Sequence, residues 1–207
     1  MKKAIIIPCS GQKVRGGSSI YIKPCLIDLL GEAEFGRLLA LRDKLSVQIK
    51  LQPGPDMNTL YSDSDIRFLP AYERYDGKMY KRAAFRESFP EFRGRGRVFI
   101  ISALYGLLDA NDHIRFYDLA MDKRLPSNVR VSQWWAVNGL RRYLDIALKN
   151  AAASEVYDLL SNKYRTAIGH LQTSDLYRAY LFNYPGLGIG SLYERGNDLK
   201  KIMTLES

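Results

Sequence analysis

The sequence predicts an α/β protein, a three-layer sandwich with a largely parallel sheet between two layers of helices. Three short apolar runs predict strands buried on both faces, at residues 4–7, 98–101 and 156–160. Segments with apolar residues at helical spacing separate these runs, and such alternation favours a parallel sheet. The 207 residues, 46% of them hydrophobic, suffice for one domain, residues 1–207, with a continuous core.

Between these strands the apolar spacing predicts helices and one further short strand. The first helical region is expected to break at Gly31, and the run Pro53-Gly54-Pro55 predicts a turn. The expected helices span residues 26–45, 78–88 and 132–148, and the expected short strand spans residues 66–72.

The C-terminal part predicts a helical hairpin. Residues 173–203 have the pattern of two helices joined by a glycine-rich turn at residues 183–188. This turn resembles a helix-hairpin-helix element, in which glycines such as Gly186 and Gly188 let backbone N–H groups approach a DNA phosphate. A plain connector between helices is the alternative interpretation.

The composition predicts a polyanionic partner and excludes several classes of chemistry. Lys and Arg number 31 against 22 Asp and Glu, a formal charge of +9, which is typical of a DNA-binding protein; a soluble protein that happens to be basic is the alternative. With two His and two Cys, neither a zinc site nor a disulfide framework is expected, and no metal or cofactor is predicted. The apolar runs are too short to span a membrane, and a cytoplasmic location is expected.

Polar side chains follow each of the three buried strands. Because ligands of parallel sheets bind outside the carboxyl ends of the strands, these side chains are expected to share one site. The three groups are Ser10, Gln12 and Lys13; Ser102, Tyr105 and Asp109; and Ser161, Asn162 and Tyr164.

The segment after the second strand holds the candidate catalytic residues. Asp109 and Asp112 could stabilise the cationic sugar formed when a glycosidic bond to a nucleobase breaks, or activate water. Lys13 could neutralise developing negative charge. Helix or turn capping by the two carboxylates, and a core position for Tyr117, are the structural alternatives.

Other side chains are candidates for holding the substrate. Ser10, Gln12 and Asn162 could hydrogen-bond to a base edge, and tyrosines can stack on an unstacked base. The expected base-binding residues also include Ser102, Tyr105, Tyr117 and Tyr164. The arginines expected to contact the DNA backbone, unless they merely form a solvated surface, are Arg86, Arg93, Arg95 and Arg97.

Several blocks of the sequence resemble the peroxide stress protein YaaA family. The blocks occur in order over roughly residues 75–168 and include Gly77-Lys78-Met79-Tyr80, residues 101–108, residues 117–121 and Asp158-Leu159-Leu160-Ser161-Asn162-Lys163-Tyr164. This resemblance implies DNA binding and protection from oxidative DNA damage.

The N-terminal segment resembles a second family. Pro8-Cys9-Ser10-Gly11-Gln12-Lys13 is similar to the motif of archaeosine synthase, which modifies a deazaguanine base in tRNA, although Val14-Arg15 replaces that motif's proline and tyrosine. The domain that carries the motif resembles the uracil-DNA glycosylase fold, so this resemblance implies that fold and a site that handles a nucleobase.

The sequence therefore supports three hypotheses. The first is a DNA glycosylase that extrudes a damaged or modified base and cleaves its N-glycosidic bond, for repair or defence against phage DNA. The second is a non-catalytic DNA-binding protein of the peroxide-stress kind. The third is an enzyme that modifies a tRNA base, with Lys13 central. The partner is DNA in the first two, duplex or single-stranded.

Overall fold

A mostly parallel sheet of five strands lies at the centre of the protein in this computed structural model, which describes residues 2–58 and 65–205. The strand order is β4-β3-β1-β6-β7, and only β4 runs antiparallel to its neighbour. The strands are β1 (Lys3–Pro8), β3 (Gly96–Ser102), β4 (Gly106–Asp109), β6 (Glu155–Asp158) and β7 (Arg178–Leu181).

The central position of β1 follows from its sequence. Residues 4–7 are fully buried, and β1 pairs in parallel with β3 on one side and β6 on the other. A run of Ala and Ile without polar interruption is suited to a strand covered on both faces. The three predicted strands are therefore confirmed, and their carboxyl ends meet at one edge of the sheet.

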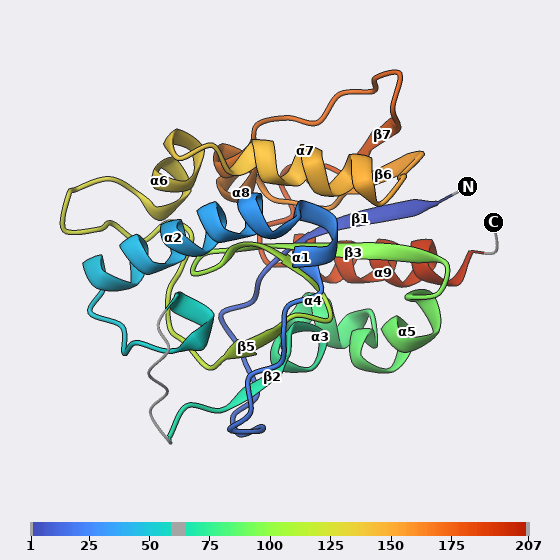
Figure 1. Ribbon diagram of the computed structural model, residues 1–207. Coiled ribbons are helices and arrows are strands. Elements are labelled where there is room, and N and C mark those ends of the chain that lie inside the picture. The colour runs from blue at the N-terminus through green and yellow to red at the C-terminus, as the bar shows by residue number, and fades with distance from the viewer. Residues whose placement is uncertain (1, 59–64, 206–207) are drawn as a thin grey trace.

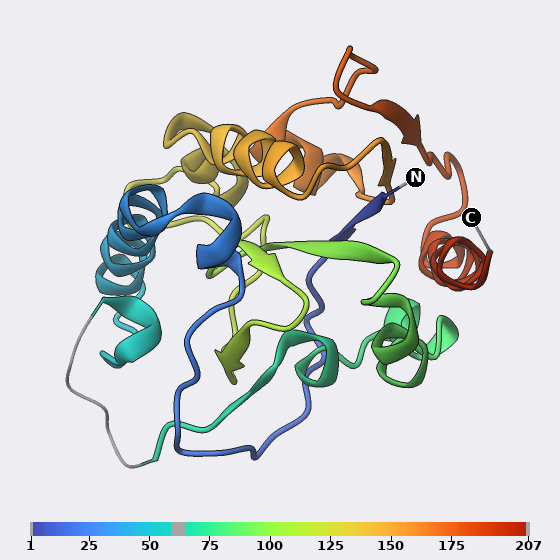
Figure 2. The ribbon, with the colours of Figure 1, turned by 45° about the vertical axis from the view of Figure 1, so that its right-hand side comes forward.

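Helices cover both faces of this sheet (Figures 1 and 2). On one face α1 packs on α2 and α7, and α8 on α6 and α7; on the other, α9 packs on α4 and α5. The first group is α1 (Leu26–Leu30), α2 (Glu32–Gln48), α6 (Val131–Val137), α7 (Leu140–Asn150) and α8 (Asn162–Ile168). The second is α3 (Ala71–Arg74), α4 (Lys78–Arg82), α5 (Phe85–Phe92) and α9 (Gly190–Thr204).

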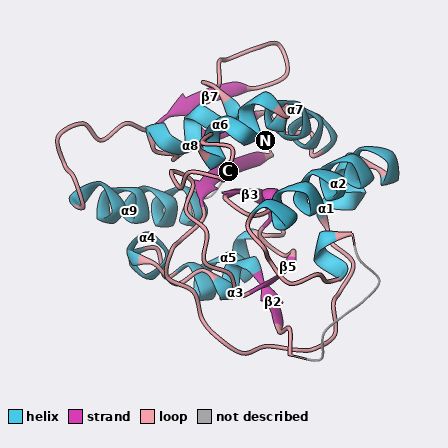
Figure 3. Ribbon diagram, turned by 90° about the vertical axis from the view of Figure 1, so that its left-hand side faces the viewer, coloured by secondary structure: helices cyan, strands magenta, loops and turns pink. Residues whose placement is uncertain are grey.

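A small two-stranded ribbon lies apart from the main sheet. Strands β2 (Phe68–Pro70) and β5 (His113–Arg115) pair antiparallel beside α3 (Figure 3). A 3-10 turn, η1 (Pro55–Met57), begins at the last residue of the predicted Pro-Gly-Pro turn. Its buried Asp56 accepts hydrogen bonds from Arg115 and from the hydroxyl of Tyr105.

Two of the predicted helices are broken where the backbone takes a left-handed conformation. The helix expected at 132–148 ends at Val137 and restarts after Gly139, whose φ is 75°. The helix expected at 78–88 splits at Ala84, with a φ of 46°. Left-handed backbone cannot continue a right-handed helix. The predicted break at Gly31 is confirmed, since α1 and α2 meet there.

The predicted C-terminal helical hairpin is wrong. Within residues 173–203 the first expected helix is replaced by β7, and only the second forms, as α9. The residues of β7 pair with β6 in register Glu155↔Arg178 to Asp158↔Leu181. This pairing satisfies the backbone hydrogen-bonding groups along the open edge of β6. Because it depends on a strand elsewhere in the chain, the spacing of apolar residues within 173–203 could not reveal it. Gly186 and Gly188 therefore lie in a strand-to-helix connection.

Candidate functional site

A cavity of about 200 Å³ lies at the carboxyl ends of β1 and β6, and we call it the inner cavity. It is bounded by the loop after β1, the start of α4, the start of α8 and one face of α9. Its lining residues are Pro8, Cys9, Ser10, Gly11, Gly77, Lys78, Met79, Tyr80, Ser161, Lys163, Tyr164, Leu192 and Arg195.

A wider cavity of about 700 Å³, the outer cavity, adjoins the inner one. The two share Ser161, Lys163 and Arg195, and together we call them the basic groove. The outer cavity is also lined by Asn162, His170, Asn183, Tyr184 and Pro185. None of the described residues that line either cavity carries a carboxylate, whereas Lys78, Lys163 and Arg195 carry positive charge.

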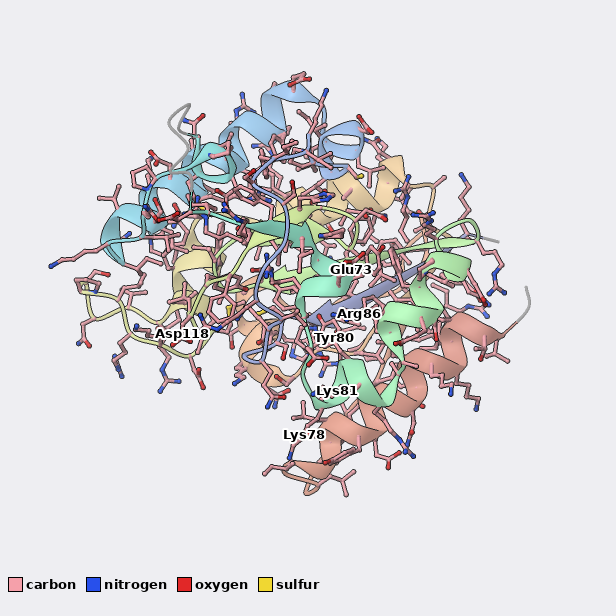
Figure 4. All side chains as sticks on the ribbon, turned by 90° about the horizontal axis from the view of Figure 1, so that it is seen from below. Glu73, Lys78, Tyr80, Lys81, Arg86 and Asp118 are labelled. Carbon is pink, nitrogen blue, oxygen red and sulfur yellow. The ribbon has the colours of Figure 1, made fainter. Side chains whose placement is uncertain are left out.

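Two glycines bring the walls of the groove together. A Cβ on Gly77 would lie 2.1 Å from the Ser10 hydroxyl, so the start of α4 can pack directly on the loop after β1. A Cβ on Gly196 would lie 2.8 Å from the Met79 carbonyl oxygen and 2.6 Å from Arg82 Cβ. The close packing of α9 on α4 therefore depends on Gly196, and it places the neighbouring Arg195 against the groove. Figure 4 shows Lys78 on α4 beside α9.

Arg195 holds a fixed guanidinium in the wall between the two cavities. The residue is only 6% exposed. Its Nη1 donates to the carbonyl and hydroxyl oxygens of Ser191, and the guanidinium stacks on the Tyr184 ring at 4.7 Å from the ring centroid. Its Nε is buried without a hydrogen-bond partner among the described residues.

Tyrosine hydroxyls join the helices to the end of β1. Tyr164 on α8 donates to the Cys9 carbonyl oxygen at 3.0 Å and lies 3.4 Å from the Cys9 sulfur. Tyr80 on α4 donates to the Pro8 carbonyl oxygen at 2.8 Å. These bonds fix the floor of the inner cavity. Cys9 and Cys25 are free thiols.

Lys13 lines neither cavity of the groove, and its ammonium lies over a cluster of hydroxyls at the end of β3. Its Nζ is 4.0 Å from the Tyr117 ring centroid, a cation–π contact. Beneath it the Tyr117 hydroxyl is 2.8 Å from that of Tyr75 and 2.9 Å from that of Ser102. Burial lowers the pKa of Lys13, against the raising effect of Cys9 and Asp118.

The residues predicted to bind a base divide into lining and buried groups. Ser10 and Tyr164 line the inner cavity, and Asn162 lines the outer one. Gln12 is exposed but lines neither. The buried residues are Ser102 and Tyr105, both 0% exposed, and Tyr117, 3% exposed. The geometry of Tyr105, whose hydroxyl donates to Asp56 at 2.5 Å, matches a core role better than stacking.

The two predicted catalytic carboxylates do not line the basic groove. Asp109 lies at the far end of β4 from the Ser102↔Gly106 pair and forms an ion pair with Arg97 at 3.3 Å. Asp112 accepts hydrogen bonds from the backbone N–H of Leu26 and of Asp109. Burial and the charge of Asp109 raise the pKa of Asp112 to about 7. The bond from Leu26, the first residue of α1, matches the alternative in which Asp112 caps a helix, and Asp109 accepts a turn-type hydrogen bond from the Asn111 N–H.

The four predicted backbone-contacting arginines do not share one surface. Arg86 lies at the start of α5, where it donates to the Glu73 carbonyl oxygen (Figure 4). Arg93, Arg95 and Arg97 instead line a third cavity, at the amino ends of β1 and β3. Gly186 and Gly188 are exposed, directly after Pro185 in the wall of the outer cavity.

The cations of the basic groove are the residues that the sequence did not single out. Lys163 directly follows the predicted Asn162, so its place after a buried strand was an available signal. Lys78 opens a helix, which gives no hint of a ligand. Arg195 comes from a helix with no motif, and only the packing of α9 on α4 brings it to the groove.

Comparison with protein families decides the relationship. The family model of the peroxide stress protein YaaA matches residues 28–182. The chain belongs to the peroxide stress protein YaaA family. No curated protein matches it in a sequence comparison.

The family match agrees with the resemblance seen in residues 75–168. It begins at residue 28, so the resemblance of residues 8–13 to archaeosine synthase gains no support. The uracil-DNA glycosylase-like fold likewise stays a prediction. No helix among the described residues is long and apolar enough to cross a membrane.

Proposed function

We propose that this YaaA-family protein binds DNA through the basic groove without cutting it, in the response to peroxide stress. The observation that carries the proposal is the charge of the groove: three cations and no described carboxylate line two adjoining cavities. Phosphate contacts by Lys and Arg supply most of the affinity of sequence-independent DNA binding.

The cations of the groove differ in what they offer a phosphate. Lys78 is exposed, and Lys163 forms a solvated ion pair with Asp122 at 3.4 Å. Each ammonium group otherwise has only a loose ring contact, at 5.6 Å and 5.9 Å from the ring centroid, so both can turn to a DNA backbone. Arg195 is held in place by Ser191 and the Tyr184 ring, and its guanidinium lies in the wall of both cavities, where it suits an acceptor such as a phosphate oxygen. Flexible cations at the rim and a fixed one inside match a backbone that lies along the groove.

Binding fits this geometry better than base excision. Cleavage of an N-glycosidic bond requires a carboxylate or another base beside the sugar. Asp112 bonds the backbone N–H groups of Leu26 and Asp109, and Asp109 pairs with Arg97, and neither carboxylate lines the groove. The glycosylase hypothesis would therefore need a different group to act on the sugar.

The test is the salt dependence of binding to a fluorescein-labelled duplex, followed by fluorescence anisotropy. We expect log K to fall linearly with log salt, by about 0.9 for each phosphate contact. The Lys78→Gln/Lys163→Gln variant should bind more weakly, with a slope smaller by about 2. The matched control is Lys44→Gln/Lys50→Gln, which removes two exposed charges that line neither cavity.

The outcomes separate clearly. Loss of slope in the groove variant but not in the control supports the proposal. An unchanged slope in the groove variant would overturn it, as would wild-type protein that binds no duplex at the lowest salt. A parallel titration with single-stranded DNA shows which form the groove prefers.

A further inference from the structure

A second basic cavity lies at the opposite end of the sheet from the groove. It has a volume of about 240 Å³ at the amino ends of β1 and β3, and we call it the amino-end cavity. Both described chain ends lie on this side (Figure 1). Its lining residues are Lys2, Lys3, Leu29, Arg93, Gly94, Arg95, Gly96, Arg97, Asn150 and Ala151. Five of these are cationic and none is acidic.

Three of the five cations have structural partners. Lys3 Nζ donates to the Leu205 carbonyl oxygen and Arg95 to that of Met203, both at 2.9 Å, so they hold the last turn of α9. Arg97 pairs with Asp109 at 3.3 Å. Carbonyl contacts leave the charges of Lys3 and Arg95 uncompensated, so the cavity keeps a positive potential.

The other two cations are free to bind. Lys2 and Arg93 are exposed, and their side chains make no hydrogen bond or ion pair with any described residue. Gly94 lies between two of the arginines, and a Cβ built on it would meet nothing within 4 Å. The outer side of the cavity at Gly94 is therefore unobstructed, and a DNA backbone could lie there across Lys2 and Arg93.

The distance between the two basic sites allows both to be occupied at once. They lie at opposite ends of β1, whose six residues at ~3.3 Å each place them roughly 17 Å or more apart. The Debye length is about 8 Å at physiological salt, so charges bound at one site are largely screened from the other. The two sites lie at opposite ends of the sheet, so each can hold its own duplex.

We propose that the amino-end cavity is a second DNA-backbone site, so that one molecule bridges two DNA duplexes. The proposal rests on DNA binding by the basic groove. In the response to peroxide stress, one protein molecule would then hold two separate duplex segments together.

The test is a sandwich assay with wild-type protein. A biotinylated duplex on streptavidin beads is saturated with protein and washed, and a fluorescent second duplex is then added. We expect retention of the second duplex. The Lys2→Glu/Arg93→Glu variant should stay on the beads through the groove yet retain at least tenfold less second duplex.

Controls separate bridging from other causes. Lys44→Glu/Lys50→Glu carries the same charge change away from both sites and should bridge as the wild type does. The Lys2→Gln/Arg93→Gln variant removes the two positive charges without adding negative ones. Thermal melting of this variant and of Lys2→Glu/Arg93→Glu shows whether either has lost its fold. Light scattering in the same buffer must show a monomer, because a dimer could bridge through two grooves.

The possible failures are distinguishable. Protein that does not stay on the first duplex contradicts the proposed function itself. Protein that stays but retains no second duplex overturns bridging and leaves the groove intact. Bridging that survives both Lys2/Arg93 variants, or that requires a dimer, also overturns the amino-end site.

Discussion

Substituting Arg165 with Met should destabilise the protein strongly and open one wall of the basic groove. Arg165 Nε donates to Asp158 Oδ2 at 2.8 Å, and the two side chains are 3% and 0% exposed. Its Nη2 donates to the Phe182 carbonyl oxygen at 2.9 Å, and Nη1 bonds Asn183. Arg165 thus ties β6 and α8 to the segment that leads into Tyr184 and Pro185.

The magnitude follows from the charge left behind. Removing one partner of a buried ion pair costs about 3–5 kcal/mol, because the remaining carboxylate stays buried without a cation beside it. For a domain of this size each kcal/mol lowers Tm by about 2–4 °C, so a fall of roughly 6–20 °C is expected. The exposed Arg37, paired with Glu34, provides the control: Arg37→Met should cost at most about 1 kcal/mol.

Thermal unfolding followed by circular dichroism measures both variants. The double variant Asp158→Asn/Arg165→Met removes the unpaired charge, so it should be more stable than Arg165→Met alone. DNA affinity measured below the melting range should fall in Arg165→Met, since the outer cavity loses its support. A single variant that melts within about 2 °C of wild type, or a double variant less stable than the single one, would refute the reasoning.

Three further predictions concern the same regions. Between pH 3.8 and about 7 Asp112 keeps in the native state a proton that the unfolded chain loses, because its pKa is raised from 3.8 to about 7. The free energy of unfolding should therefore fall as pH rises through this range, by at most about 1.4 kcal/mol per pH unit. Urea titrations at several pH values should show a flatter pH profile for Asp112→Asn than for the wild type. Gly77→Ala should lower Tm and weaken DNA binding, because the added methyl group would collide with the Ser10 hydroxyl. Adding Ser10→Gly to this variant should restore part of the Tm and part of the affinity. Gly36→Ala, where a Cβ meets nothing, should lower neither Tm nor affinity. Mass spectrometry of normal and hypermodified DNA after incubation with the protein should detect no free base, and release would revive the glycosylase hypothesis.

Local sequence patterns were enough to identify the central layers of this fold. The apolar runs at residues 4–7 and 98–101 predicted strands buried on both faces, and their alternation with helical segments predicted the parallel arrangement. The edge strands β4 and β7 were missed. Both are four residues long and pair with one neighbour only, so their existence depends on an open edge elsewhere in the chain.

The sequence by itself determined that polar residues gather at the carboxyl ends of β1 and β6, and that the chain is basic. Only the tertiary structure decided which of them form a site. It buried Ser102 and Tyr105, kept Asp109 and Asp112 out of the groove, and divided the arginines between separate surfaces. The reason is physical. A buried strand and the polar residues that follow it are consecutive in the sequence, so a local pattern reveals them. The groove is formed by helices such as α4, α8 and α9, whose packing joins residues more than a hundred positions apart.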